Sequence, residues 1–180
     1  DNGSTDRSVA LLREEFPAVQ VVQLPRNEGF TGGNAAGVAA STGDVLVFFN
    51  NDMRVEPDAV RHLVGALDGV TACAAARVLS WDGRFVDFVR GAINFEARGF
   101  QDFYGEPAAS ERVRSPETFF PNGGAFAVTR DAYDRAGGFD ESFFAYYDDV
   151  DLGWRLRRAG KRCVPASARL PRNGASKRTP

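Results

Sequence analysis

The amino-acid sequence predicts an α/β fold in which helices flank a mostly parallel sheet. Segments with strand character and segments with helical character alternate along the chain, without an internal repeat. Residues 45–49 are five consecutive apolar residues, a pattern typical of a strand buried on both faces of a parallel sheet. With 180 residues, 43% of them hydrophobic, the chain can form a core, and we expect a single domain over residues 1–180.

Periodic apolar residues and breakers define the other elements. Val9, Leu12 and Phe16 recur at helical spacing, so we expect a helix that Ser4 caps, and then a strand at residues 19–24. Residues 27–37 form a glycine-rich loop that leads into a helix ending near residue 41; its small residues suit either a phosphate or tight helix–sheet packing. The later expectations are a helix from residue 56, strands at 72–79, 125–129 and 162–165, a hairpin turn at 81–84, and helices at 130–136 and 148–160.

Two stretches lack such patterns. Residues 90–117 mix glycine, proline, charges and aromatic side chains without a period, and are predicted to form a long functional loop or an insertion. The tail from residue 169 is basic, and we expect it to be mobile.

Composition narrows the functional classes. The 22 basic and 24 acidic residues give a net charge of −2, so nucleic acid is not an expected partner. No apolar run approaches the length of a membrane span, and we expect no signal peptide at the start of the chain. Cys73 and Cys163 lack metal-type spacing, which predicts reduced thiols in a cytoplasmic protein, and His62 is expected to be a solvent-facing helix residue.

The first candidate site is Asn50-Asn51-Asp52, directly after the apolar run. Ligands bind at the carboxyl ends of strands in open α/β sheets. Asn50 and Asp52 offer hard oxygens to a divalent cation, which could neutralise a diphosphate. The same three residues also suit an ordinary turn, so the motif by itself leaves both interpretations open.

Five stretches, in this order, give the sequence a resemblance to the family-2 inverting glycosyltransferases with the GT-A fold, especially their bacterial rhamnosyltransferase-like branch. The stretches are Asp1-Asn2-Gly3-Ser4-Thr5-Asp6; Asn27-x-Gly29-Phe30-x-x-Gly33-Asn34-x-x-Gly37; Phe49-Asn50-Asn51-Asp52; Asn122-Gly123-Gly124 with Gly137-Gly138-Phe139-Asp140-Glu141; and Asp148-Asp149-Val150-Asp151-Leu152-x-Trp154-Arg155. The resemblance implies a nucleotide-sugar-binding half at residues 1–89, a variable loop at 90–118, an acceptor and catalytic half at 119–168, and a tail at 169–180.

The resemblance also implies a donor site. Asp1 corresponds to the carboxylate that reads the nucleotide base, and the nucleotide-facing loop contributes Asn27, Gly33 and Asn34. Turn formation by Asp1 and hydrogen bonding within the loop are the rival interpretations.

Asp52 matches the second acid of the family's D-x-D group, and Asn50 occupies its first position. Mg²⁺ or Mn²⁺ would therefore be held by Asp52, the diphosphate and water, and would stabilise the departing nucleoside diphosphate.

Asp149 matches the family's general base, which takes the proton of the acceptor hydroxyl opposite the leaving group. Asp148 is then expected to orient the acceptor. Both are also good residues for a helix start, where the helix dipole would lower their pKa values and mutual repulsion would raise one of them. Asp151 and Arg155 lie four residues apart, so a helix-surface ion pair is expected.

Asn122, Gly123 and Gly124 correspond to the floor beneath the donor sugar and the acceptor. The two glycines carry no side chain, so a sugar can lie close to the backbone. We expect Trp154 to belong to the core, since Val150 lies one turn before it.

Together these features imply metal-assisted, inverting transfer of a hexose or deoxyhexose from a UDP- or dTDP-sugar to a saccharide or lipid-linked acceptor. The setting would be bacterial polysaccharide biosynthesis, in the cytoplasm or at the inner face of the cell membrane. The alternatives are an inactive, truncated nucleotide-sugar-binding fragment and a sugar-nucleotide nucleotidyltransferase.

Two features depart from the family pattern. Family members begin with a strand, a helix and a second strand before the first motif, and the absence of these elements would leave a gap in the sheet. We therefore expect either a fragment of a longer chain, which we favour, or remaining strands that close up in an unusual way. Members often carry a histidine after the last strand, but residues 170–176 contain none, which leaves metal binding open.

Overall fold

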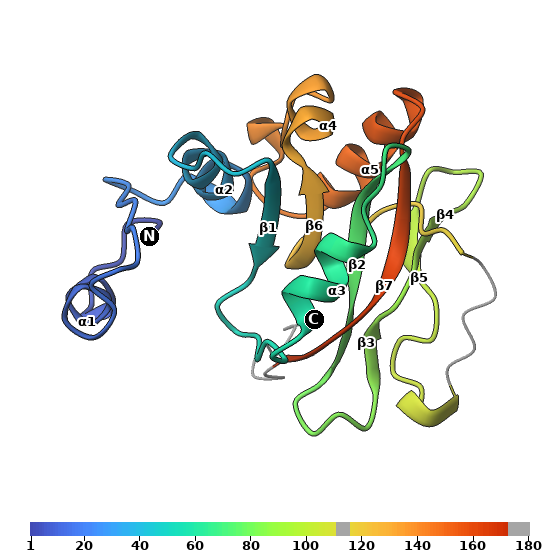
Figure 1. The fold of residues 1–180 in the computed structure, drawn as a ribbon, viewed down its shortest axis with the longest axis horizontal. Coiled ribbons are helices and arrows are strands. Elements are labelled where there is room, and N and C mark those ends of the chain that lie inside the picture. Colours follow the sequence, from blue (N-terminus) through green and yellow to red (C-terminus); the bar gives the residue numbers. More distant parts are fainter. Residues whose placement is uncertain (111–115, 173–180) are drawn as a thin grey trace.

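The computed structural model describes residues 1–110 and 116–172, and within this part the chain forms an α/β fold with one mixed sheet (Figure 1). The sheet has the strand order β1-β6-β2-β3, and β7 also pairs with β2. Its strands are β1 (Val45–Phe49), β2 (Thr71–Ser80), β3 (Val86–Phe88), β6 (Ala125–Thr129) and β7 (Arg162–Arg172). The helices are α1 (Ser8–Glu15), α2 (Gly29–Ala39), α3 (Ala59–Gly65), α4 (Arg130–Arg135) and α5 (Asp148–Arg158).

The sheet is not mostly parallel as the sequence predicted. Among the described strands only β2 and β7 pair in parallel, and β1–β6, β6–β2 and β2–β3 are antiparallel. The strand β1 pairs with β6 alone within the described ranges, so it is an edge strand. Its side chains alternate between buried and half-buried, which corrects the prediction of a strand buried on both faces. The apolar run at 45–49 identified a strand correctly but not its place in the sheet.

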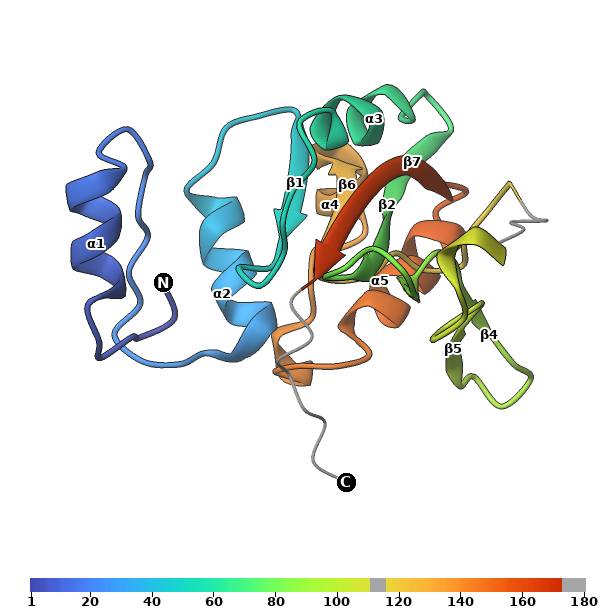
Figure 2. The ribbon, with the colours of Figure 1, turned by 90° about the horizontal axis from the view of Figure 1, so that it is seen from below.

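Helices cover both faces of the sheet. The helix α3 packs against β7, β2 and β6, and α5 packs against β7 from the opposite face, as Figure 2 shows. Leu63 of α3 and Leu152 and Leu156 of α5 are at most 1% exposed, so each helix contributes its buried leucines to the core. Trp154, by contrast, is 46% exposed, which corrects its expected place in the core.

Aromatic rings join the sheet to the segment that precedes α5. Phe48 on β1 stacks on Phe126 on β6, with ring centroids 4.6 Å apart. Phe139 meets both rings edge-on, and its backbone N–H donates a hydrogen bond to the buried Tyr133 hydroxyl at 3.0 Å. The strand β1 and the chain leading into α5 therefore share one core.

The amino-terminal segment lies apart from the sheet (Figure 1), and it corrects two predictions. Residues 19–24 are not a strand. The amino group of Asp1 donates to Val22 O at 2.8 Å, Leu24 N donates to Asp1 O at 2.9 Å, and Val19 N donates to Phe16 O at 2.9 Å, the bond of a turn. A β-rich composition forms a strand only where a neighbouring strand accepts its hydrogen bonds. The helix α1 is not capped by Ser4, since it begins at Ser8, whose N–H is bound by the Asp6 carboxylate.

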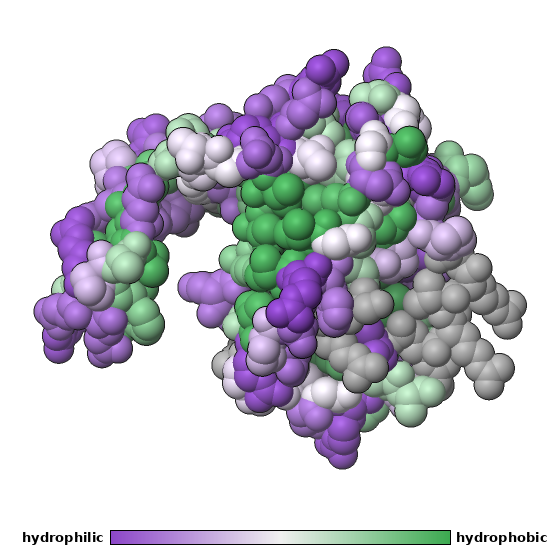
Figure 3. All heavy atoms as spheres, in the orientation of Figure 1, coloured by the Kyte–Doolittle hydropathy of each residue, from purple (hydrophilic) through white to green (hydrophobic). Residues whose placement is uncertain are grey.

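A hollow lies between α2 and β1. The helix α2 and β1 line a pocket of about 280 Å³ there. Figure 3 shows apolar side chains gathered on the surface over β1 and the neighbouring part of the sheet.

Two glycine-containing stretches are more ordered than the sequence suggested. Residues 29–39 form the helix α2, so most of the predicted glycine-rich loop is helical. Residues 90–117 are not a continuous loop: β4 (Gly91–Ile93) and β5 (Gly99–Gln101) pair as an antiparallel hairpin. The strand β7 extends to Arg172, well past the predicted 162–165, and residues 173–180 of the expected mobile tail lie outside the described part of the chain.

Four further elements agree with the sequence prediction. The strands β2 and β6 and the helices α4 and α5 occupy the expected ranges. His62 is exposed as predicted. Cys73 and Cys163 are free thiols, buried side by side on β2 and β7 with their sulfur atoms 2.9 Å apart.

Candidate active site

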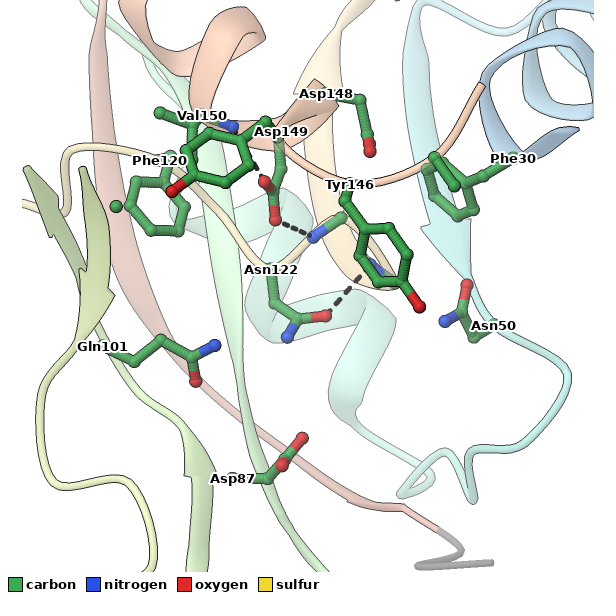
Figure 4. Close-up of a pocket in the computed structure, with 15 residues that line it drawn as sticks. Phe30, Asn50, Asp87, Gln101, Phe120, Asn122, Tyr146, Asp148, Asp149 and Val150 are labelled. Carbon is green, nitrogen blue, oxygen red and sulfur yellow. Dashed lines mark hydrogen bonds between the residues drawn. The ribbon is translucent and has the colours of Figure 1, made fainter. Parts of the chain in front are cut away.

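A pocket of about 460 Å³ opens at the carboxyl end of β1, where the sequence predicted a ligand site. Three segments that are distant in the sequence form most of it: Asn50 after β1, residues 120–124 before β6, and residues 145–150 at the start of α5. Asp87 on β3, Gln101 on β5 and Phe30 on α2 complete the wall (Figure 4).

Asp149 is the central ionisable group of this pocket. Its Oδ2 accepts a hydrogen bond from Gly123 N at 3.1 Å, and its Oδ1 accepts one from Val150 N at 2.8 Å. Its removal from water raises the pKa of Asp149 to about 6, and the charge of Asp148 adds to this effect. Burial therefore outweighs the backbone N–H groups, which lower the pKa. A carboxylate with a pKa this close to neutrality is suited to accept a proton.

Asp148 lies beside Asp149 and is only 5% exposed. Burial also raises its pKa. One turn later, Asp151 forms the predicted ion pair with Arg155, with Oδ2 2.9 Å from Nε. Arg155 also donates to Ala136 O, so this pair fixes α5 to the end of α4. Asp148 and Asp149 therefore face the pocket on a helix that is anchored on its other side.

The two glycines of the floor have a steric reason to be glycine. A Cβ on Gly124 would lie 2.5 Å from Asn50 Nδ2, and a Cβ on Gly123 would lie 3.3 Å from Asp148 Oδ2. Gly124 O accepts a hydrogen bond from Asn50 N at 2.8 Å, and Asn122 Oδ1 accepts one from Gly124 N at 3.0 Å. The floor is thus joined to both the end of β1 and the start of α5.

The turn before α5 holds three non-glycine residues with positive φ: Phe144 (59°), Tyr146 (71°) and Tyr147 (61°). Such conformations cost energy and are concentrated at functional sites. Phe144 O accepts hydrogen bonds from Phe30 N (2.6 Å) and Thr31 N (3.3 Å), which satisfies the first turn of α2. The strained turn therefore connects α2 to the carboxylates of α5 and leaves Tyr146 85% exposed beside the pocket.

The structure brings six of the predicted site residues into this pocket. They are Asn50, Asn122, Gly123, Gly124, Asp148 and Asp149.

The other five predicted residues, Asp1, Asn27, Gly33, Asn34 and Asp52, do not line it. Asn27 Oδ1 accepts hydrogen bonds from Asn2 Nδ2 and Gly29 N, both at 2.9 Å, and Asn34 Nδ2 donates to Phe30 O at 2.8 Å. These are the local bonds of the rival interpretation, and the nucleotide-binding role of these residues stays a prediction.

Several pocket residues were not predicted from the sequence, notably Phe30, Asp87, Gln101, Phe120 and Tyr146. Phe30 lies within one of the recognised motifs and Tyr146 lies just before another. Their closeness to these motifs could have identified them as pocket residues. Asp87 and Gln101 lie on strands of three residues, too short to show a period in the sequence.

Oxygen donors at the end of β1 suit a divalent cation only in part. No group of three His, Cys, Asp or Glu side chains that could hold a metal occurs within residues 1–110 and 116–172. Asp52 with Asn50 nevertheless matches the way Mg²⁺ is bound through one or two carboxylates together with substrate phosphates. These oxygen atoms are of the kind that a divalent cation prefers, and the metal site itself stays a prediction.

The fold is the GT-A fold of glycosyltransferases. Two solved structures share the fold: GalNAc-T7 with UDP, GalNAc and Mn²⁺ (TM-score 0.75, 16% identity, 96% of this chain and 36% of that one) and the mannosyltransferase PcManGT from Pyrobaculum calidifontis with GDP-Man and Mn²⁺ (TM-score 0.67, 18% identity, 94% and 45%). The chain belongs to glycosyl transferase family 2, whose family model matches residues 1–137.

Curated relatives include the N-acetylglucosaminyl-diphospho-decaprenol L-rhamnosyltransferase of Mycobacterium tuberculosis, which is 27% identical over 184 aligned positions. The match covers 89% of this chain and 60% of that enzyme. N-acetylgalactosaminyltransferase 6 of Drosophila melanogaster is 32% identical over 141 positions, 72% of this chain and 21% of that protein. The chain thus spans at most about three fifths of these relatives. No helix in the described ranges is long and apolar enough to cross a membrane.

Proposed function

We propose that this chain transfers a hexose or deoxyhexose, with inversion, from a UDP- or dTDP-sugar to a hydroxyl group of a saccharide or lipid-linked acceptor. Its membership of glycosyl transferase family 2 supports the reaction class. A relative whose name specifies rhamnosyl transfer to a diphospho-decaprenol-linked sugar supports a deoxyhexose and a lipid-linked acceptor. A role in bacterial polysaccharide biosynthesis, at the inner face of the cell membrane, belongs to the same proposal.

The observation that carries the proposal is Asp149, a carboxylate with a pKa of about 6 that lies in the pocket beside its floor. Inverting transfer is a single displacement at the anomeric carbon, so one base must remove the acceptor proton as the new bond forms. We assign that proton to Oδ2, which lies beside the floor at Gly123. Near neutral pH Asp149 is largely ionised and able to accept it.

The neighbouring residues position the two substrates. Gly123 and Gly124 let the donor sugar lie close to backbone, while Asn50 marks the side of the pocket on which the diphosphate leaves. Asp148, nearly buried beside the base, orients the acceptor hydroxyl and raises the pKa of Asp149. Asp1, Asn27, Gly33 and Asn34 are proposed to hold the nucleotide.

A divalent cation, Mg²⁺ or Mn²⁺, is part of the proposal. Asp52, with Asn50, would hold it through oxygen atoms together with the diphosphate of the donor. When bound, it supplies Lewis-acid stabilisation of the departing nucleoside diphosphate. The presence of Mn²⁺ in the two similar structures is consistent with this assignment.

Acceptor-dependent release of nucleoside diphosphate tests the proposal. The purified protein is incubated with UDP- and dTDP-hexoses, Mn²⁺ and glycoside acceptors, and the anomeric configuration of the product is read by NMR. We expect nucleoside diphosphate and a glycoside of inverted configuration. Release of pyrophosphate would indicate a nucleotidyltransferase, and retained configuration would remove Asp149 from its role as the base of a single displacement.

A further inference from the structure

We infer that Gln101 and Asp87 form the acceptor subsite of the pocket and select an uncharged sugar ring with a hydroxyl group next to the reacting one. This inference rests on the proposed function, since it assigns a substrate to the same pocket. It concerns β3 and the β4–β5 hairpin, which lie in or beside the stretch that the sequence left unexplained.

The geometry of the reaction indicates on which side of the pocket the acceptor binds. In an in-line displacement the nucleophile approaches the anomeric carbon from the side opposite the leaving group. In the proposed function Asn50 lies on the diphosphate side of the pocket, and the base Asp149 contacts the floor at Gly123. Figure 4 shows Gln101 across Asn122 and Asp149 from Asn50, and Asp87 on the wall below. The wall made by β3 and β5 is therefore the one available to the acceptor.

Gln101 has an unsatisfied polar atom in this wall. Its Oε1 is buried and has no hydrogen-bond partner within the described part of the protein. A buried acceptor without a partner has lost its hydrogen bond to water without gaining another, so a ligand that donates to it restores that bond. The carboxamide also carries two N–H donors. One glutamine can therefore donate to one hydroxyl and accept from its neighbour.

The charge of the subsite favours a neutral ligand. Asp87, Asp148 and Asp149 all line the pocket, and its described lining contains no lysine or arginine. Arg90, the residue before β4, is paired with Asp102 through Nε at 2.6 Å. A carboxylate or phosphate on the acceptor ring would therefore meet like charges. Hydroxyl groups, which donate to carboxylates, suit this wall.

The hairpin holds Gln101 in a fixed position relative to the base. Gln101 pairs with Gly91, and a Cβ on Gly91 would lie 2.6 Å from the Phe120 ring. A Cβ on Gly99 would lie 3.0 Å from Cγ2 of Val150, the residue after Asp149. The hairpin thus packs closely on the segments that carry the floor and the base.

A buried threonine also connects the hairpin to the segment that leads to the floor. Thr118 is fully buried, and its hydroxyl accepts a hydrogen bond from Gly91 N at 2.8 Å and donates one to Phe120 O at 2.7 Å. Phe119 N donates to Gly91 O at 2.8 Å. The subsite is therefore built into the same backbone that leads to the floor at Asn122.

Glycoside binding to the protein in the presence of UDP and Mn²⁺ tests this inference. The two probes are p-nitrophenyl β-glucoside and p-nitrophenyl β-glucuronide, which differ only in the charge-bearing C6 group. We expect the unaltered protein to bind the glucoside at least about tenfold more tightly than the glucuronide. Gln101→Ala should weaken glucoside binding about five- to tenfold, as expected for one lost hydrogen bond, with UDP affinity unchanged.

Matched variants distinguish a loss of the acceptor subsite from general damage to the fold. Asp87→Asn should weaken discrimination against the glucuronide, and Gln20→Ala, at an exposed position outside the pocket, should change neither probe. Equal binding of the two probes, no detectable glucoside binding, or a Gln101→Ala variant that loses UDP instead of the glucoside would overturn the inference. If the glycosides bind as expected but no sugar is transferred, the proposed function fails and the subsite assignment stands.

Discussion

Replacing Asp149 with Asn should make the protein more stable at neutral pH while it removes the base. The pKa of Asp149 is raised from 3.8 to about 6 in the folded chain. A difference of roughly two pKa units corresponds to about 3 kcal/mol of unfavourable free energy for keeping the ionised group in the fold. Asparagine has the same shape and no charge, but it weakens the hydrogen bonds from Gly123 and Val150, so we expect a net gain of about 1–3 kcal/mol.

The sign of the pH dependence follows from the raised pKa. Below about pH 4 Asp149 is protonated in the folded and unfolded states and carries no penalty; the penalty grows as pH rises and is complete above about pH 6. Urea unfolding of the unaltered protein and the Asp149→Asn variant at about pH 4 and about pH 8 measures it. The variant should gain stability only at the higher pH. An equal or lower stability of the variant at about pH 8 would refute the assignment of a destabilised carboxylate.

Further predictions concern activity and the floor of the pocket. Transfer (kcat/KM) should rise with pH through about 6 and then level off, as Asp149 ionises; a profile flat across this range would argue against Asp149 as the base. Gly124→Ala should raise the KM for the donor several-fold, since its Cβ would lie 2.5 Å from Asn50 Nδ2, whereas Gly37→Ala, with nothing within 4 Å, should leave KM unchanged and add up to about 1 kcal/mol of helix stability. Chelation by EDTA should abolish transfer and added Mn²⁺ should restore it; full activity in EDTA would remove the cation from the mechanism. Thr118→Val should cost about 1–3 kcal/mol in urea unfolding, because it leaves the buried Gly91 N–H without a partner.

The sequence predicted the helices and strands of residues 119–160 well because their signals are local. Residues 148–158 carry acidic residues at the helix start and apolar residues at helical spacing, and this helix forms with Asp148 and Asp149 in the pocket. The glycines at 123 and 124 indicated a close approach, and the structure gives the neighbours that require it. Both features depend on short stretches of chain, so a single sequence reveals them.

The errors concern properties that depend on distant partners. The apolar run at 45–49 does not specify whether a strand has one neighbour or two, and the β-branched stretch at 19–24 does not reveal whether any strand is present to pair with it. The hairpin at 91–101 consists of strands of three residues, so no period could form. Gln101 reaches the pocket through that hairpin, and its place in the lining could only be found from the fold.

The direction of the Asp149 pKa shift is a further property that the sequence alone did not determine. The position of Asp149 at a helix start predicts a lowered pKa, and its neighbour Asp148 predicts a raised one. Burial in the pocket decides between them, with the charge of Asp148 as a second contribution. Burial results from the turn at residues 144–147 and from the floor, which are assembled from separate parts of the chain.

The most direct test of the central claim is the transfer rate of the Asp149→Asn variant at saturating donor, with nucleotide binding measured on the same sample. The account predicts a loss of about 10²–10⁴-fold in kcat with unchanged affinity for UDP, because the base is removed and the donor site is retained. Asp131→Asn, an exposed aspartate on α4, serves as the control and should keep full activity. Turnover by Asp149→Asn at the rate of the unaltered protein would contradict the claim that this carboxylate accepts the proton of the acceptor.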